Sequence, residues 1–375
     1  MIYLDNAATT PVRAEALQAA WPWLTSDFGN ASSTHELGGR ASNALDGARE
    51  RVAHWLGARA SEVIFTSGGT EGNNLGVIGL ALANPRGKHI VSAKTEHEAV
   101  LASIDHLVRV HQFEVTWLDL DSEGSLKNGV ATLEAALRPD TTLVTLMIAN
   151  NEIGTIHPVA ELAAAAHQVG VLFHTDAVQA VGWLNLNVQT LGVDALSISG
   201  HKFGAPKGSG IFYLRGRTKI EPIIHGGGQE AGLRSGTENV AWAVALATAI
   251  ELLPDCDVER VRVSQLRDAF ILRVMQVAQN ALPTGHPVDR LPNIASFCFV
   301  GQSGESILLQ LEERGIVCSS GSACAAGKDE PSHVLLAIGL DAEVAQTAVR
   351  FSLGHDTTAE QLDAVADILG QFLAS

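Results

Sequence analysis

Short apolar runs alternate with stretches of helical periodicity over roughly the first two thirds of the chain. The run 193–198 is typical of a short buried strand, and 40–57 is typical of a helix that closes on a glycine. Further strands are predicted at 62–66, 88–93, 113–118, 142–148, 171–173 and 209–214, and further helices at 74–83, 98–110, 130–137 and 159–169. This alternation predicts an α/β protein whose mostly parallel sheet is covered by helices on both faces.

The pattern changes after a glycine-rich stretch at 225–230. Two long helices are predicted at 237–253 and 258–282. A smaller α+β unit is predicted from segments at 293–300, 304–313, 315–318, 332–338 and 349–352, and a capping-box pattern at 357–360 opens a last helix. We therefore expect a large domain of residues 12–255 and a small domain of residues 1–11 and 256–375.

Composition and charge narrow the possible functions. A chain of 375 residues can bury a sizeable core, and its net charge of −16 argues against nonspecific nucleic-acid binding. We expect no signal peptide, because the N-terminal apolar stretch is too short, and no apolar run reaches membrane-spanning length. The four cysteines are few and irregularly spaced, which predicts a cytoplasmic protein with neither a disulfide framework nor a metal site.

Polar clusters follow several predicted strands, at the strand ends where ligands bind in such sheets. They lie at 67–71, 95–97, 150–152, 176–179 and 199–202. In the last cluster, Lys202 follows the strand 193–198. An ammonium near apolar surface has a lowered proton affinity, which makes the amine nucleophilic toward an aldehyde. Lys202 is thus a candidate Schiff-base lysine; the alternative is a surface lysine at a strand end.

Two further strand ends carry groups suited to a pyridine-based cofactor. A carboxylate at Asp176 would keep a ring nitrogen protonated, although the residue could also be a helix cap or a loop aspartate. His97 could stack on an aromatic ring or transfer protons, or it could cap a helix. Asn151 could donate to a ring hydroxyl or simply form a turn.

The cluster 67–71 contains two glycines between a predicted strand and a predicted helix, which is typical of an anion site as well as of ordinary strand–helix turns. Arg350 interrupts an apolar strand and could bind a substrate carboxylate or form an inward ion pair. Cys324 lies in a Ser/Gly/Ala stretch at 319–327 that predicts a mobile loop, where a thiol is either a reactive carrier or incidental. Cys318 and Cys298 are interpreted as structural.

Taken together, these motifs resemble the group I cysteine desulfurases of the class-V aminotransferase family over nearly the whole chain. The motifs that carry the resemblance lie at 3–11, 28–30, 65–71, 95–97, 150–154, 174–176, 199–202, 226–230, 233–239, 319–324, 330–332 and 350–354. The resemblance implies the aspartate-aminotransferase-like fold, type I, of pyridoxal-phosphate enzymes. It also implies a cysteine loop at about 318–331 in the small domain.

The resemblance implies a role for each candidate. Lys202 would bind pyridoxal 5'-phosphate covalently, Asp176 would pair with the pyridine nitrogen, and His97 would stack on the ring. The oxygen side of the ring would contact Gln179 and Asn151, and the phosphate would contact Gly69, Thr70, Ser199, His201 and, across a homodimer, Thr237. Arg350 would bind the substrate carboxylate, with help from Asn30, and Cys324 would carry the persulfide.

The implied reaction removes sulfur from L-cysteine and releases L-alanine, with the sulfur passed to an acceptor such as an iron–sulfur scaffold protein. Two enzymes of the same fold are alternatives: a selenocysteine lyase and a small-amino-acid aminotransferase. A noncatalytic scaffold or sulfur-relay protein is the alternative from another class. Neither nucleic acid nor membrane is expected as a partner.

Overall fold

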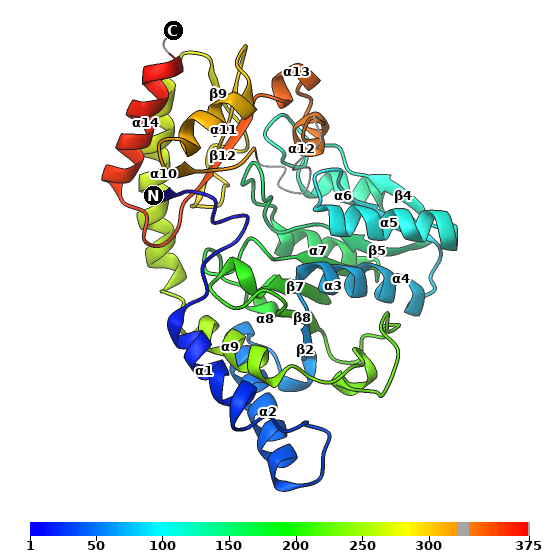
Figure 1. Cartoon of the computed structure of the whole chain (residues 1–375). Helices are drawn as coiled ribbons and strands as arrows, with labels where there is room; N and C mark the ends of the chain where they lie inside the picture. The colour runs from blue at the N-terminus through cyan, green and yellow to red at the C-terminus, as the bar shows by residue number, and fades with distance from the viewer. Residues whose placement is uncertain (321–329, 374–375) are drawn as a thin grey trace.

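The computed structural model describes residues 1–320 and 330–373, and within them a seven-stranded sheet forms the centre of the molecule (Figure 1). The strand order is β2-β8-β7-β6-β5-β3-β4, and β8 runs in the direction opposite to the other six strands. Its strands are β2 Val63–Thr66, β3 His89–Ser92, β4 Glu114–Trp117, β5 Thr141–Thr145, β6 Leu172–Asp176, β7 Ala195–Ser199 and β8 Gly210–Leu214. The predicted α/β fold with a mostly parallel sheet is confirmed.

Helices cover both faces of this sheet, as the predicted pattern requires. The helices in residues 12–255 are α1 Ala14–Thr25, α2 Glu36–Leu56, α3 Gly69–Asn74, α4 Leu80–Ala83, α5 Glu98–His111, α6 Val130–Ala136, α7 Val159–Gln168, α8 Val188–Leu191 and α9 Val240–Glu251. One apolar core contains α4 and α5, and the other contains α2, α7 and α9. Central strands such as β5 and β7 are buried along their whole length because both faces are covered.

A second group of elements lies at the upper left and top of Figure 1. It contains a three-stranded antiparallel sheet, in the order β12-β10-β9, and a parallel pair of β1 with β11. Its elements are β1 Ile2–Tyr3, α10 Cys256–Val277, β9 Ala281–Pro283, β10 Ile294–Phe299, α11 Gly304–Glu312, β11 Ile316–Val317, α12 His333–Ala337, α13 Ala342–Ala345, β12 Ala348–Ser352 and α14 Ala359–Leu373. This separate set of sheets supports the division that we propose, with residues 12–255 as one domain and 1–11 and 256–375 as the other.

Several predicted helix boundaries are wrong. The helix predicted at 258–282 ends at Val277, because residues 281–283 pair with β10 instead. The helix predicted at 237–253 begins at Val240, where the Asn239 side chain caps it by accepting from the amide of Trp242. The helix α1 was not predicted.

Two further predicted helix starts differ from the structure. The helix predicted at 74–83 is the end of a longer helical segment that begins at Gly69 and passes through a π-helical stretch, Leu75–Gly79. At the last helix, the capping pair is Thr358 with Gln361, one residue later than the pattern at 357–360 predicted. In the described residues, no helix combines the length and apolar character needed to cross a membrane.

Candidate active site

The strands β7, β6, β5 and β3 run in the same direction, so their carboxyl ends lie along one edge of the large sheet. Asp176 is the last residue of β6, and Lys202 follows β7 by one short turn. His97 and Asn151 follow the adjacent strands β3 and β5 in the chain. The shared edge gathers the candidates from separate parts of the sequence, as expected for a ligand site in this type of sheet.

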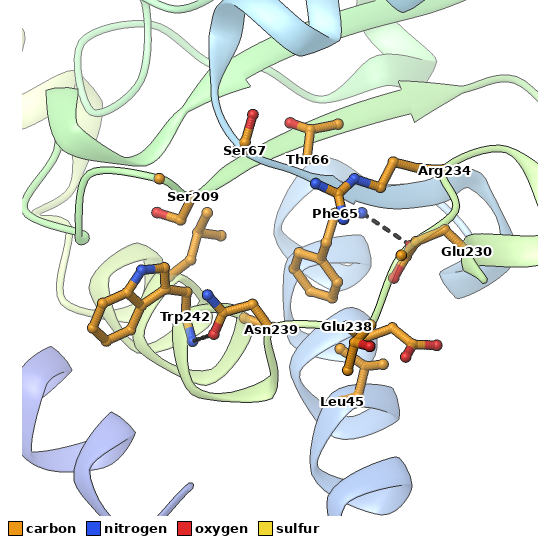
Figure 2. Close-up of a pocket in the computed structure, with 16 residues that line it drawn as sticks. Leu45, Phe65, Thr66, Ser67, Ser209, Glu230, Arg234, Glu238, Asn239 and Trp242 are labelled. Carbon is orange, nitrogen blue, oxygen red and sulfur yellow. Dashed lines mark hydrogen bonds between the residues drawn. The ribbon is translucent and has the colours of Figure 1, made fainter. Parts of the chain in front are cut away.

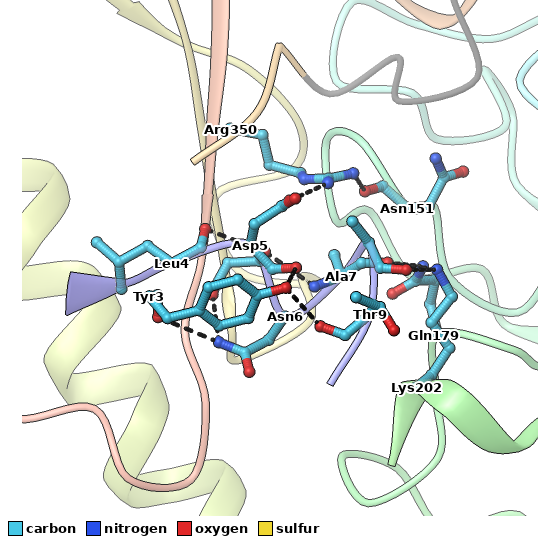
Figure 3. Close-up of polar contacts among 12 residues, drawn as sticks. Tyr3, Leu4, Asp5, Asn6, Ala7, Thr9, Asn151, Gln179, Lys202 and Arg350 are labelled. Carbon is cyan, nitrogen blue, oxygen red and sulfur yellow. Dashed lines mark hydrogen bonds and ion pairs between the residues drawn. The ribbon is translucent and has the colours of Figure 1, made fainter. Parts of the chain in front are cut away.

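Lys202 is half-buried and ends the 3₁₀ turn Gly200–Lys202. Its Nζ donates to two backbone carbonyls of the N-terminal segment, at 2.6 Å to Ala7 O and 2.9 Å to Ala8 O. The buried Gln179 side chain donates to the same Ala7 oxygen at 3.0 Å. Figure 3 shows residues 3–9 running between Lys202 on one side and Arg350 on the other. The N-terminal segment therefore belongs to the site, and sequence analysis gave it no such role.

Asp176 is 5 % exposed, and both of its carboxylate oxygens accept hydrogen bonds. One oxygen accepts from the side-chain amide of Asn73, and the other accepts from the amide of Val178 at 2.9 Å. These two hydrogen bonds fix the orientation of the carboxylate. Asn73 is 1 % exposed and was missed, although it lies one helical turn after Gly69.

The start of α3 lies against the end of β7 and leaves little room for side chains. Gly68 has a φ of 154°, in the region that favours glycine, and a Cβ at Gly69 would lie 2.6 Å from Val178 Cγ2. Ser199, which ends β7, is 5 % exposed. Backbone N–H groups at the start of a helix can bind an anion, so the phosphate site at Gly69, Thr70 and Ser199 stays a prediction.

His201 lies beside Lys202, and its Nδ1 is 3.1 Å from Thr9 Oγ1. Burial, together with the positive charges of Lys202 and Lys207, lowers the pKa of the imidazole to about 4. The ring is therefore neutral at neutral pH. It can contact a phosphate as a hydrogen-bonding group without adding a charge.

His97 is the N-cap of α5, since its Nδ1 accepts from the amide of Ala99 at 3.0 Å. The capping alternative is thus realised, and it leaves the proton of a neutral ring on Nε2. Asn151 forms a turn after β5, and its Oδ1 is a buried oxygen without a hydrogen-bond partner among the described residues. A buried oxygen of this kind is costly unless a bound group donates to it, which fits a cofactor hydroxyl.

Arg350, on β12, is 2 % exposed, and its guanidinium bonds to two elements of the site. Nη1 donates to Asn151 O at 2.7 Å, and Nη2 donates to Asp5 Oδ1 at 2.8 Å. The inward ion pair that the sequence left open is present. The same guanidinium edge still lies beside Asn151, where a substrate carboxylate could bind.

The structure does not bring all the predicted residues together within one chain. Asn30 is exposed in the loop between α1 and α2, which Figure 1 places at the opposite end of the molecule from β12. Thr237 is exposed and lines a cavity of about 210 Å³ between the start of β8 and α9. Figure 2 shows that cavity, with Ser67 and Ser209 on one wall and Asn239 and Trp242 on another. Cys324 lies outside the described residues.

Within residues 1–320 and 330–373, no group of three or more His, Cys, Asp or Glu side chains is placed to hold a metal ion. Cys318 is described, and burial raises the pKa of its thiol to about 12. Burial likewise raises the pKa of the Cys298 thiol to about 11. Both thiols are protonated at neutral pH, in line with a structural role.

Comparisons with known proteins agree over almost the whole chain. The curated relatives include a cysteine desulfurase IscS from Dictyoglomus turgidum, 47% identical over 374 residues, which cover 99% of this chain and 94% of that protein. Another is a cysteine desulfurase IscS from Methanosarcina thermophila, 43% identical, with 99% and 92% covered.

Solved structures agree with these relatives. A NifS-like protein superposes with a TM-score of 0.92 at 35% identity, covering 100% of this chain and 99% of that one. A structure described as SspA in complex with cysteine has a TM-score of 0.83 at 34% identity, with 94% and 99% covered. The model of the aminotransferase class-V family, whose members use pyridoxal phosphate, matches residues 2–365. By this match and by the likeness to cysteine desulfurases, the chain belongs to the class-V aminotransferase family.

Proposed function

We propose that this chain is a pyridoxal-phosphate-dependent cysteine desulfurase, which converts L-cysteine to L-alanine and leaves a persulfide on Cys324. One observation supports this most directly: residues 5–8 contact both halves of the site. Asp5 holds Arg350, and Ala7 and Ala8 hold Lys202. These contacts join the Arg350 guanidinium and the Lys202 amine through one short segment, which supports the proposal that the two groups bind the carboxylate and the amine side of an α-amino-acid substrate.

Different described residues would hold different parts of the cofactor. Lys202 would bind it covalently and Asp176 would pair with its pyridine nitrogen, while Gly69, Thr70, Ser199 and His201 would hold its phosphate. His97, Asn151 and Gln179 would contact the ring and its oxygen. Bound there, pyridoxal phosphate supplies an electron sink for a carbanion next to the amino group.

The protein groups then carry out the remaining steps. Arg350 binds the substrate carboxylate, and the Lys202 amine takes the α-proton. The Cys324 thiolate attacks the substrate sulfur, so an S–S bond forms and the carbon–sulfur bond breaks. The electron pair of that bond stays on the substrate carbon, which is protonated to give alanine. An acceptor protein, such as an iron–sulfur scaffold, then removes the persulfide sulfur.

We also propose a homodimer in which Asn30 and Thr237 act in the site of the partner subunit. Both are exposed in this chain, and the loop that contains Asn30 lies far from β12. The cysteine loop at about 318–331 would belong to the small domain. We further propose that the protein works in the cytoplasm.

The deciding experiment measures alanine and sulfide released from L-cysteine by the purified protein. The Cys324→Ser variant should keep the absorbance of the bound cofactor but form no persulfide. Cys318→Ser is the matched control, because that thiol is protonated at neutral pH and should not contribute. Alanine formation by the Cys324→Ser variant at the wild-type rate would instead support a lyase-type reaction that needs no persulfide on Cys324. Protein without cofactor absorbance would support a noncatalytic scaffold.

A further inference from the structure

A buried hydrogen bond joins the start of α12 to the turn that follows β5. Ser332 donates its hydroxyl to Glu152 Oε2, and both residues are 4 % exposed. The same serine caps α12, since its oxygen also accepts from the amide of Leu335 at 3.2 Å. Burial of a carboxylate is costly, and an apolar residue would pack there more simply, so this contact calls for a role besides stability.

His333, the first residue of α12, bonds to a second segment of the site. Its Nε2 is 3.0 Å from Glu96 O, and its Nδ1 is 3.6 Å from Glu98 Oε1. These two glutamates flank His97 in the chain. The start of α12 is therefore fixed against the segment that presents His97, as well as against Glu152.

The turn that carries Glu152 is itself rigidly held. Asn150 Oδ1 accepts from the amides of Glu152 at 2.8 Å and Ile153 at 2.9 Å, and its Nδ2 donates to Thr95 O at 2.9 Å. The backbone oxygen of Asn151, in the middle of this turn, accepts from Arg350. One turn thus holds α12 through the Glu152 side chain and the substrate-binding arginine through its backbone.

Apolar packing excludes water from this junction. Ile153 is 1 % exposed and belongs to a small core cluster with Val334 and Leu335 of α12. Hydrogen bonds in such a setting are costly to leave unmade, so the arrangement has few alternatives of similar energy.

We propose that Glu152 is a positioning residue for the reaction: through its bond to Ser332 it fixes the turn of Asn151 against the beginning of α12, and with that turn it fixes Arg350. This inference rests on the proposed desulfurase function. With that turn fixed, the Asn151 oxygen holds the Arg350 guanidinium in one orientation. The substrate carboxylate that Arg350 binds is then held in one orientation too. Loss of the Glu152–Ser332 bond loosens this orientation without removing any reacting group.

The first test compares Glu152→Ala with Glu152→Gln in the cofactor-loaded enzyme. The Ala variant should lower kcat for alanine formation by about tenfold or more, since misplacement of reacting groups has large effects on rate. The Gln variant keeps an acceptor oxygen for Ser332 and should stay within about threefold of wild type. Cofactor absorbance should be unchanged in both.

A pair of substitutions that moves the carboxylate from residue 152 to residue 332 separates an effect on positioning from an effect on stability. Ser332→Asp still caps α12 but faces Glu152 with a second carboxylate, so kcat should fall. Combined with Glu152→Gln, the glutamine amide can donate to the new carboxylate, and kcat should recover toward wild type. Recovery of thermal stability without recovery of kcat would overturn the proposal, as would wild-type kcat in Glu152→Ala.

A readout without catalysis keeps this proposal distinct from the proposed function. Amide hydrogen exchange at residues 335–337 should be faster in Glu152→Ala than in wild type, and it should return to the wild-type rate in the swapped pair. Wild-type protein that releases no alanine overturns the desulfurase function itself. Unchanged exchange in Glu152→Ala overturns the role of Glu152.

Discussion

Arg350 and Asp5 form an ion pair, with Nη2 2.8 Å from Oδ1, that joins β12 to the chain just after β1. The arginine side chain is 2 % exposed and the aspartate 18 %, so water screens the pair only weakly. The second contact of the guanidinium, to the Asn151 oxygen, fixes its plane. The group that we propose to bind the substrate carboxylate is thus oriented before any substrate arrives.

We therefore expect the planar guanidinium geometry of Arg350, as well as its charge, to be needed for substrate binding. Arg350→Lys keeps the charge but cannot bond to Asp5 and Asn151 while also binding a carboxylate bidentately. KM for L-cysteine should rise by roughly ten- to a hundredfold, the range of a lost charge-assisted bidentate contact. Steady-state kinetics measures this effect, and the exposed Arg314→Lys is the control. An unchanged KM would remove Arg350 from substrate binding.

Lys202 is expected to be the covalent attachment point of the cofactor. Lys202→Ala should abolish the absorbance band of the lysine-bound cofactor and the release of alanine, because no other amine replaces the Nζ that contacts Ala7 and Ala8. The matched control is Lys207→Ala, an exposed lysine on the same loop. Absorbance spectra of the purified variants and of the wild type measure this band. A wild-type band in Lys202→Ala would contradict the assignment.

The order of strands and helices could be predicted because it depends on local periodicity. Lys202, Asp176 and His97 could be found for a related reason: each follows an apolar run, and the ends of parallel strands share one edge of the sheet. Boundaries were less predictable where distant pairing decides them. The segment 281–283, for example, is a strand only because β10 lies beside it.

Other parts of the site have no signature in the sequence. Lys202 contacts the backbone oxygens of Ala7 and Ala8. The side chains of two alanines give no indication that their backbone oxygens accept such bonds. Asn73 and Glu152 gain their roles from partners that lie 103 and 180 positions away in the chain. Tertiary packing alone creates such pairs, so single-sequence reasoning cannot identify them.

The bond from Asn73 to Asp176 gives a prediction about the cofactor rather than the substrate. Asn73→Ala removes a donor from a buried carboxylate, which should cost about 1–3 kcal/mol of unfolding free energy. Cofactor affinity should fall as well, because the carboxylate is less firmly oriented toward the ring nitrogen. Asn74→Ala is the neighbouring control, since Asn74 bonds only to the helix carbonyl of Thr70 among the described contacts. Titration of the apoprotein with pyridoxal phosphate measures the difference, and equal affinities would contradict the prediction.

The buried His174 should make stability depend on pH in the acid range. Burial lowers the pKa of this imidazole to about 3, while its nitrogens bond to Thr145 Oγ1 at 2.8 Å and Ser197 Oγ at 3.0 Å. The unfolded chain binds a proton near pH 6.5 and the folded chain does not. The stabilising contribution is therefore complete above pH 6.5 and is lost as pH falls from 6.5 toward 3.

Replacement of His174 by Gln should flatten this dependence. Each proton taken up on unfolding contributes a slope of about 1.4 kcal/mol per pH unit, so the variant should lose a slope of roughly that size between pH 6 and 4.5. The variant should also be less stable at pH 7, because one of the two hydroxyl contacts is lost. Urea unfolding at several pH values measures the slope, with the exposed His54→Gln as control. If both variants keep the wild-type slope, His174 does not govern the acid sensitivity of the fold.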